Sequence, residues 1–172
     1  MKYLDQDADY RLTMDVFKAS HRVDTAGGAG RAKCGWKHGI GVGLSLTFPM
    51  MKGKKYVLFT SDTSWNLRVE EQYRKLLGKI DVAVVHLSSL GNELNWLFTG
   101  ARTEDYVHPQ HLGLIGTIRF IDTTRPKTIV LGEKCAELNE VWPSLASVIA
   151  EACELPPESV VAADIGTTVS LA

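Results

Sequence analysis

The sequence lacks the features that mark membrane-spanning and disulfide-rich secreted proteins. It contains no run of 18 consecutive apolar residues, which a transmembrane helix would need, and its opening MKYLDQDADY has no apolar signal-peptide core. It has only three cysteines, none in a C-x-x-C spacing, so we expect a reducing compartment and no disulfide framework. The net charge of -1 neither requires nor excludes a nucleic-acid partner. We therefore expect a cytoplasmic protein that does not enter a membrane.

The composition is that of an ordinary globular protein. The chain has 172 residues, of which 45% are hydrophobic and 23% are charged, and this is enough to build one buried core. We expect residues 1–172 to form a single domain. A doubly wound dinucleotide-binding fold is excluded, because the glycine repeat at 39–43 leads into an apolar strand and not into a helix.

Apolar runs and helical periodicity predict an α/β fold with a mixed sheet. Predicted strands are 10–20, a hairpin of 44–48 with 56–60, then 81–85, 128–131, and a closing hairpin of 160–163 with 167–171. Predicted helices are 67–80, a helix that opens at 111–113 and ends before Pro126, and 141–153. This order predicts a layered structure with helices packed on one outer face of the sheet.

Residues 22–43 hold seven of the 15 glycines, so we expect a loop. The segment is basic and includes Arg22, Arg31 and Lys33. It is either a mobile cover that touches an anionic substrate or simply a long flexible connection, and the sequence leaves both interpretations open.

Polar side chains stand where apolar strands are predicted to end. These are His21, Asp62, His86 and Glu133, and His111 stands at the start of a predicted helix. Each alone has a structural explanation, such as a turn aspartate, a core or surface histidine, or a helix-capping glutamate. Together, imidazole and carboxylate groups suit Zn²⁺, Mn²⁺ or Fe²⁺, and Asp62 could bridge two ions.

The ordered segments VFKASH, LFTSDT, DVAVVH, HLGLIGTI and KTIVLGE resemble the C-terminal half of the metallo-β-lactamase-fold hydrolases. The resemblance covers residues 10–135 and, more loosely, the closing strands. It implies one half of an αββα sandwich and a metal site with His21, Asp62 and Glu133 as ligands. Most of the family has histidine where Glu133 stands, and a carboxylate there favours a harder ion such as Mn²⁺.

The family's H-x-H-x-D-H motif, which supplies most of its metal ligands, is missing from the sequence. The missing ligands would come from a longer chain or a partner chain, or the metal chemistry has been lost. A half-sandwich would also expose one face of its sheet, so we expect a homo- or hetero-oligomer.

The resemblance implies a hydrolase that uses two Zn or Mn ions and a metal-activated water. Asp62 would bridge the ions and orient the nucleophile, and His111 would contact a phosphate. His86 would not touch the metal but would orient one of the metal-binding side chains. The basic residues at 22–33 favour a phosphodiester substrate, either a nucleotide or a nucleic acid. The alternative is a non-catalytic domain of the same fold that serves binding or assembly.

Overall fold

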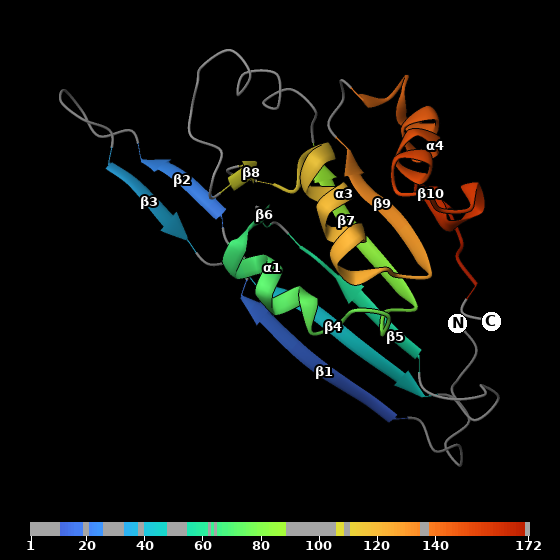
Figure 1. Cartoon of the computed structure of the whole chain (residues 1–172), viewed down its shortest axis with the longest axis horizontal. Helices are drawn as coiled ribbons and strands as arrows, with labels where there is room; N and C mark the ends of the chain where they lie inside the picture. The colour runs from blue at the N-terminus through green and yellow to red at the C-terminus, as the bar shows by residue number, and fades with distance from the viewer. Residues whose placement is uncertain are drawn as a thin grey trace.

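The computed structural model describes most of the chain from residue 11 onward (Figure 1). The described residues are 11–18, 21–25, 33–37, 40–47, 55–61, 63, 65–88, 106–108, 111–134 and 138–170. For the strands before residue 48 and for 106–108, the description covers the course of the backbone.

A six-stranded sheet forms the centre of the structure, in the order β1-β4-β5-β7-β9-β10. Its strands are β1 (Arg11–Lys18), β4 (Ile40–Thr47), β5 (Lys55–Phe59), β7 (Val82–Ser88), β9 (Thr128–Lys134) and β10 (Val160–Ala162). The strands β1, β4 and β5 are antiparallel neighbours, whereas β5, β7, β9 and β10 are parallel. The α/β class and the predicted hairpin of 44–48 with 56–60 are thereby confirmed.

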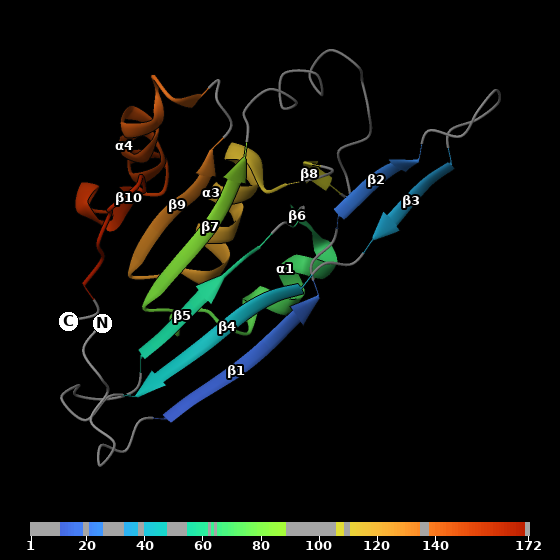
Figure 2. The same cartoon turned by 180° about the vertical axis from the view of Figure 1, so that it is seen from behind.

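The parallel strands end at one edge of the sheet, which we call the carboxyl edge. Two successive antiparallel pairings restore the strand direction, so β1 runs the same way as β5, β7, β9 and β10. The arrowheads of β1, β5, β7 and β9 accordingly point to the same side in Figure 2. Loops at such an edge can carry polar groups over a rigid base, which makes it the place to look for a ligand site.

Three helices among the described residues cover one face of this sheet. They are α1 (Leu67–Arg74), α3 (Gly113–Thr124) and α4 (Trp142–Ala152), and a 3₁₀ turn, η2 (Pro157–Ser159), follows α4. From β5 to β10 the sheet grows in one direction, and because crossovers between parallel strands are right-handed, their helices all fall on the same face. The main core lies between these two layers and takes every second strand residue, including Leu58, Val85 and Leu131.

The opposite face, which we call the helix-free face, is apolar as well. It is marked by Val57, Phe59, Val82, Val84 and Val130, and no helix of the described part of the chain packs on it. The register extends the pattern to the antiparallel strands, where apolar residues stand opposite one another: Val16 with Val42, Met14 with Leu44, and Leu44 with Val57. Alternation of this kind is expected of a sheet that buries both faces.

Residues 22–43, predicted to be a loop, contain a hairpin and the start of β4. The hairpin joins β2 (His21–Thr25) to β3 (Lys33–Lys37) as a separate two-stranded sheet that extends away from the main one in Figure 1. Glycines do not break these strands because backbone pairing holds them, as when Gly35 pairs with Val23 and Gly43 with Asp15. A second small sheet pairs β6 (Trp65–Asn66) with β8 (Tyr106–His108).

Three other boundaries differ from the sequence-based predictions. The helix predicted for 67–80 ends at Arg74, and Leu77 is 55% exposed in the turns that follow. The strand predicted for 81–85 continues to Ser88. The closing hairpin was wrong: β10 pairs in parallel with β9, and residues 167–170 form no strand.

Candidate functional site

The carboxyl edge brings together three of the side chains that the sequence singled out. His86 lies near the end of β7, Glu133 near the end of β9, and His111 just before α3. The Nδ1 atom of His86 is 3.2 Å from Oε2 of Glu133, and the ring centroids of His86 and His111 are 5.1 Å apart. The His86 side chain is 12% exposed and that of Glu133 is 73% exposed, so a sheltered imidazole holds an accessible carboxylate.

The contact between His86 and Glu133 depends on an unusual backbone conformation. The register sets His86 opposite Gly132, so regular alternation would point Glu133 toward the other face of the sheet. Glu133 instead has a φ of 52°, in the left-handed region, and its carboxylate reaches the imidazole on the neighbouring strand. For a residue other than glycine this conformation costs about 1 kcal/mol, so the surrounding structure must impose it.

Left-handed residues are concentrated at this edge of the sheet. Of the five described residues other than glycine with positive φ, Arg125 and Glu154 follow helices, where such a conformation is common. The other three are Ser61, Ser88 and Glu133, at the ends of β5, β7 and β9. Because strained backbone gathers where function requires it, this distribution favours a functional role for the carboxyl edge.

The end of β5 is tied to His86 by a side chain. The Thr60 hydroxyl accepts a hydrogen bond of 3.1 Å from the backbone N–H of His86, and it lies 3.4 Å from the carbonyl oxygen of Ser61, to which it donates. Thr60 is fully buried, and its own N–H donates to the Val84 carbonyl. Asp62 follows two residues later.

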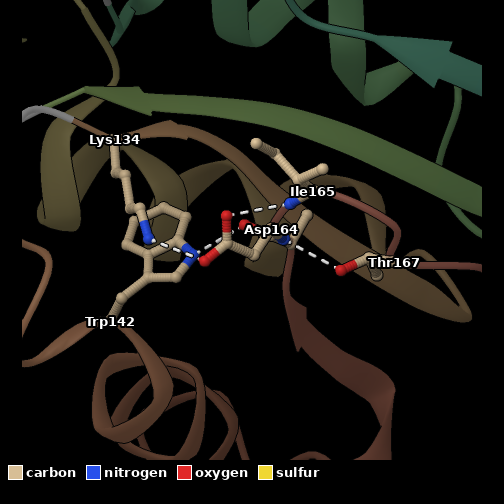
Figure 3. Close-up of polar contacts among 6 residues, drawn as sticks. Lys134, Trp142, Asp164, Ile165 and Thr167 are labelled. Atoms are coloured by element: carbon tan, nitrogen blue, oxygen red, sulfur yellow. Dashed lines mark hydrogen bonds and ion pairs between the residues drawn. The ribbon is translucent and has the colours of Figure 1, made fainter.

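A polar cluster fixes the chain directly after Glu133 (Figure 3). The ammonium of Lys134 lies 3.3 Å from Oδ2 of Asp164 and 5.6 Å from the centroid of the Trp142 ring. The Trp142 indole donates to the Ala163 carbonyl at 2.9 Å, so the start of α4 and the segment after β10 are both joined to β9. Hydrogen bonds from the Ile165 N–H and then from Lys134 hold the pKa of Asp164 below its ordinary value.

The remaining predicted site residues are distributed differently. Asp62 and Arg31 lie outside the described residues, although Ser61 and Thr63, on either side of Asp62, are described. His21 and Arg22 begin the hairpin strand β2, and Lys33 begins β3. For His21, Arg22 and Lys33 the structure describes the course of the backbone. Because the hairpin starts three residues after β1, its first residues follow the carboxyl edge, whereas Lys33 pairs with Thr25 at the other end of β2, about 13 Å along the strand.

The described side chains are suitable in kind for a metal but do not form a complete site. Imidazole and carboxylate groups bind Zn²⁺ and Mn²⁺, and His86, His111 and Glu133 supply both. Within the described ranges, however, no group of three or more His, Cys, Asp or Glu residues is arranged to hold an ion. A metal at this edge would therefore need Asp62 or further ligands in addition to Glu133. In the sheet order, β5 lies between β1 and β9. In the sequence, Asp62 follows β5 and His21 follows β1, whereas Glu133 belongs to β9.

Two residues that shape this edge were not singled out from the sequence. Thr60 could have been identified from the sequence, because it continues the alternation of Tyr56 and Leu58, which face the core, and so places a polar residue at a buried position. Lys134 could not have been identified in this way, since its partners Trp142 and Asp164 lie 8 and 30 residues away in the sequence.

Comparisons of the chain with protein-family models, with curated proteins and with solved structures found no match. In the part of the chain that the structure describes, no helix has both the length and the apolar character needed to span a bilayer.

Proposed function

We propose that the chain carries part of the catalytic site of a metal-dependent hydrolase with the metallo-β-lactamase fold, acting on a phosphodiester. The observation that carries this proposal is the meeting of His86, His111 and Glu133, from three separate segments, at the carboxyl edge of the sheet. The layering agrees with it, because within the described residues three helices cover one face of the sheet while the other face is apolar and carries no helix.

The metal would be held by the carboxylates of Asp62 and Glu133, with His21 as a further ligand. His86 suits the role of an orienting residue, since its Nδ1–H can donate to Glu133 and hold the carboxylate in one direction. The remaining ligands would come from a segment or chain that completes the site. A bound Zn or Mn ion would supply an activated water and an electrophile for the scissile group.

His111 is suited to contact the phosphate. It directly precedes Leu112, the capping residue of α3, and the N-terminus of a helix attracts anions through its backbone N–H groups and its dipole. Leu112, the residue that caps α3, provides no side-chain hydrogen bond to the first turn. An anionic group between His111 and α3 would therefore find favourable electrostatics, and the imidazole would be placed to donate a proton to a leaving oxygen.

The β2–β3 hairpin favours a polyanionic substrate, a nucleotide or a nucleic acid. Arg22 and Lys33 lie on paired strands of this hairpin, one near its start and one near its far end. Cations spaced along an arm follow the phosphates of an extended substrate better than they surround a single small anion.

Metal binding is the first test of this function. We expect the native chain to bind Zn²⁺ or Mn²⁺ saturably by calorimetry, and to hydrolyse bis(p-nitrophenyl) phosphate with the ion once the segment or chain that completes the site is supplied. Asp62→Ala and Glu133→Gly should each weaken metal binding at least tenfold. Glycine is chosen at 133 because it accepts a φ of 52° without strain, so a loss of binding would not reflect misfolding.

The matched control is Glu158→Gln, an exposed acid in η2 that should leave metal binding unchanged. Binding that is equally strong in native protein, Asp62→Ala and Glu133→Gly would contradict the proposed ligands. A native chain that binds neither ion would contradict the hydrolase itself.

The second candidate function is a non-catalytic binding or assembly domain of the same fold. It is favoured by the helix-free face, because Phe59 on that face is 39% exposed, although Val57, Val82 and Val130 beside it are buried, and an exposed aromatic side chain can serve in a contact surface. A chain that binds no metal but forms a stable oligomer would support this candidate.

A further inference from the structure

The chain reverses its direction shortly after β10. The Thr167 N–H donates to the Asp164 carbonyl at 3.0 Å, which closes a four-residue turn. The Thr167 hydroxyl accepts from the Asp164 N–H at 2.8 Å, on the other side of the same turn. Gly166 has a φ of 86°, the left-handed value that the third residue of a type II turn adopts. The turn therefore directs the residues that follow it back toward the sheet.

The returning segment, residues 167–170, reaches the helix-free face. Its Val169 packs against a cluster of three valines on that face, which we call the valine cluster and which consists of Val57, Val82 and Val130. These valines are between 5% and 8% exposed, although no helix of the described part of the chain lies on them, whereas Phe59 on the same face is 39% exposed. The returning segment thus helps to cover one part of the face and leaves another part open.

The turn before the returning segment is anchored to its surroundings (Figure 3). The Asp164 carboxylate accepts from the Ile165 N–H at 2.8 Å and lies 3.3 Å from the Lys134 ammonium. The Trp142 indole donates to the carbonyl of Ala163, directly before the turn, at 2.9 Å. These contacts hold the start of the turn to β9 and α4, so the point from which the segment returns is fixed.

The returning segment itself is mostly exposed. Thr167, Thr168 and Ser170 are exposed, and Val169 is the partly buried residue among the four. Segments with few buried apolar contacts open at a lower free energy than the strands and helices of a core. An exposed segment that follows an anchored turn can therefore lift from the face while the rest of the fold stays intact.

We propose that residues 167–170 are a strap that closes over the valine cluster and limits self-association of the chain. In the closed strap, Val169 covers the cluster and the contact surface is confined to Phe59 and its surroundings. In the open strap, the valine cluster joins Phe59 in one larger apolar surface. Opening exposes the same surface on every copy of the chain, so two copies bury it against each other in an isologous contact.

The first test compares Val169→Ser with Ile165→Ser in the full chain. Both variants exchange a branched apolar side chain for serine within a few residues, but Ile165 is fully exposed at the tip of the turn and Val169 packs on the cluster. We expect Val169→Ser to increase binding of the apolar dye anilinonaphthalene sulfonate. It should also strengthen self-association about tenfold in sedimentation velocity, since one valine added to a contact is worth about that factor. Ile165→Ser should match the native chain in both measurements.

The second test opens the turn and leaves the apolar contact in place, so it stays informative if Val169→Ser folds poorly. Thr167→Val removes the hydroxyl that accepts from the Asp164 N–H. Thr168→Val makes the same exchange at the next exposed residue, whose hydroxyl takes no part in the turn. We expect Thr167→Val to increase dye binding and self-association, and Thr168→Val to leave both unchanged.

The proposal is overturned if Val169→Ser and Thr167→Val bind dye and associate no more strongly than the native chain. It is also overturned if Ile165→Ser and Thr168→Val change as much as their counterparts. Adding Phe59→Glu to Val169→Ser then locates the contact. A return to monomer would support a surface shared by Phe59 and the valine cluster, and an oligomer that persists would show that the strap does not control this contact.

Discussion

At the scale of single residues, Asp81 is the clearest structural carboxylate. It lies at the edge of the sheet opposite the carboxyl edge, where its Oδ2 accepts from the Tyr56 N–H at 2.8 Å and its Oδ1 from the Lys127 ammonium at 2.7 Å. Partial burial alone would raise the pKa of Asp81. The hydrogen bonds from Lys127 and Tyr56, with the charges of Lys127 and Lys55, outweigh that effect and hold the pKa below its ordinary value of 3.8.

The lowered pKa predicts how Asp81 contributes to stability at different pH values. A carboxyl group with a depressed pKa stabilises the folded state above its unfolded pKa, and this contribution is lost as the pH falls through the folded pKa. We expect Asp81→Asn to lower the free energy of unfolding by about 1–2 kcal/mol at pH 7 and by less below pH 3.8, measured by urea denaturation.

The control for Asp81 is Asp122→Asn, which removes an exposed ion pair with Arg125 within α3 and its cap. An exposed pair contributes little, so this variant should change stability by less than about 0.5 kcal/mol. Two results would show that the contacts of Asp81 with Tyr56 and Lys127 do not stabilise the fold. One is an equal loss of stability in the two variants at pH 7, and the other is an Asp81→Asn effect that grows in acid.

Single residues also show where sequence reasoning stops. The ends of apolar runs located His86 and Glu133 near the carboxyl edge, because runs and polar interruptions are visible in the sequence. Their contact was not predictable, because it requires the left-handed backbone of Glu133, and glutamate carries no signal for that conformation as glycine or asparagine would. The turn at Ser61 is hidden for the same reason.

At the scale of elements, α1 depends on Asn66, the capping residue that precedes it. The Asn66 side chain caps the helix by accepting from the N–H groups of Arg68 and Val69, at 3.0 and 3.1 Å. The helix has only eight residues, too few to be stable alone, and it is held to the core by Val69 and Tyr73. The cap therefore determines where the helix begins and how its buried face is aligned.

We expect Asn66→Ala to lower the free energy of unfolding by about 1–2 kcal/mol, since Asn66 is buried and two backbone donors would lose their acceptor. Asn66→Asp retains an acceptor oxygen and should recover most of the loss. Urea denaturation of the three proteins measures this difference. If alanine and aspartate at position 66 gave the same stability, the cap would have no part in holding α1.

The elements that the sequence predicted well are those with a long internal pattern. The hairpin of β4 with β5, the strands β7 and β9, and the helices α3 and α4 all have apolar periodicity over most of their length. The misses depended on partners elsewhere in the chain. Residues 160–171 were expected to pair with each other, but β10 pairs with β9, about 30 residues earlier, and the glycine-rich strands β2 and β3 are held by each other.

At the scale of the whole molecule, the two faces of the sheet differ in cover. One face is packed under three helices, whereas the helix-free face keeps Phe59 39% exposed beside Val84, its partner in the register. Val57, Val82 and Val130 on this face are buried, with Val169 packed against them, so a contact with a partner would centre on Phe59. We therefore expect the chain to form an oligomer or to bind a partner through the helix-free face.

Replacing Phe59 with glutamate should weaken this association, because a charge would be placed at the centre of an apolar contact. We expect light scattering coupled to size-exclusion chromatography to show a shift toward monomer for Phe59→Glu. The control is Leu77→Glu, an apolar residue that is 55% exposed after α1. A native chain that stays monomeric at high concentration, or a Leu77→Glu variant that dissociates equally, would argue against this contact surface.

The hydrogen bond from Trp142 to Ala163 has a consequence for the order in which the chain folds. The β4–β5 hairpin joins strands that are neighbours in the sequence. Each parallel pairing from β5 to β10 instead joins strands separated by a crossover helix, and such pairings form more slowly. The strand β10 follows the last of these helices. Ala163 comes directly after β10, so the indole of Trp142 acquires its partner when the final strand docks. The fluorescence of Trp142 should therefore follow the slowest phase of refolding, while the antiparallel half is already formed.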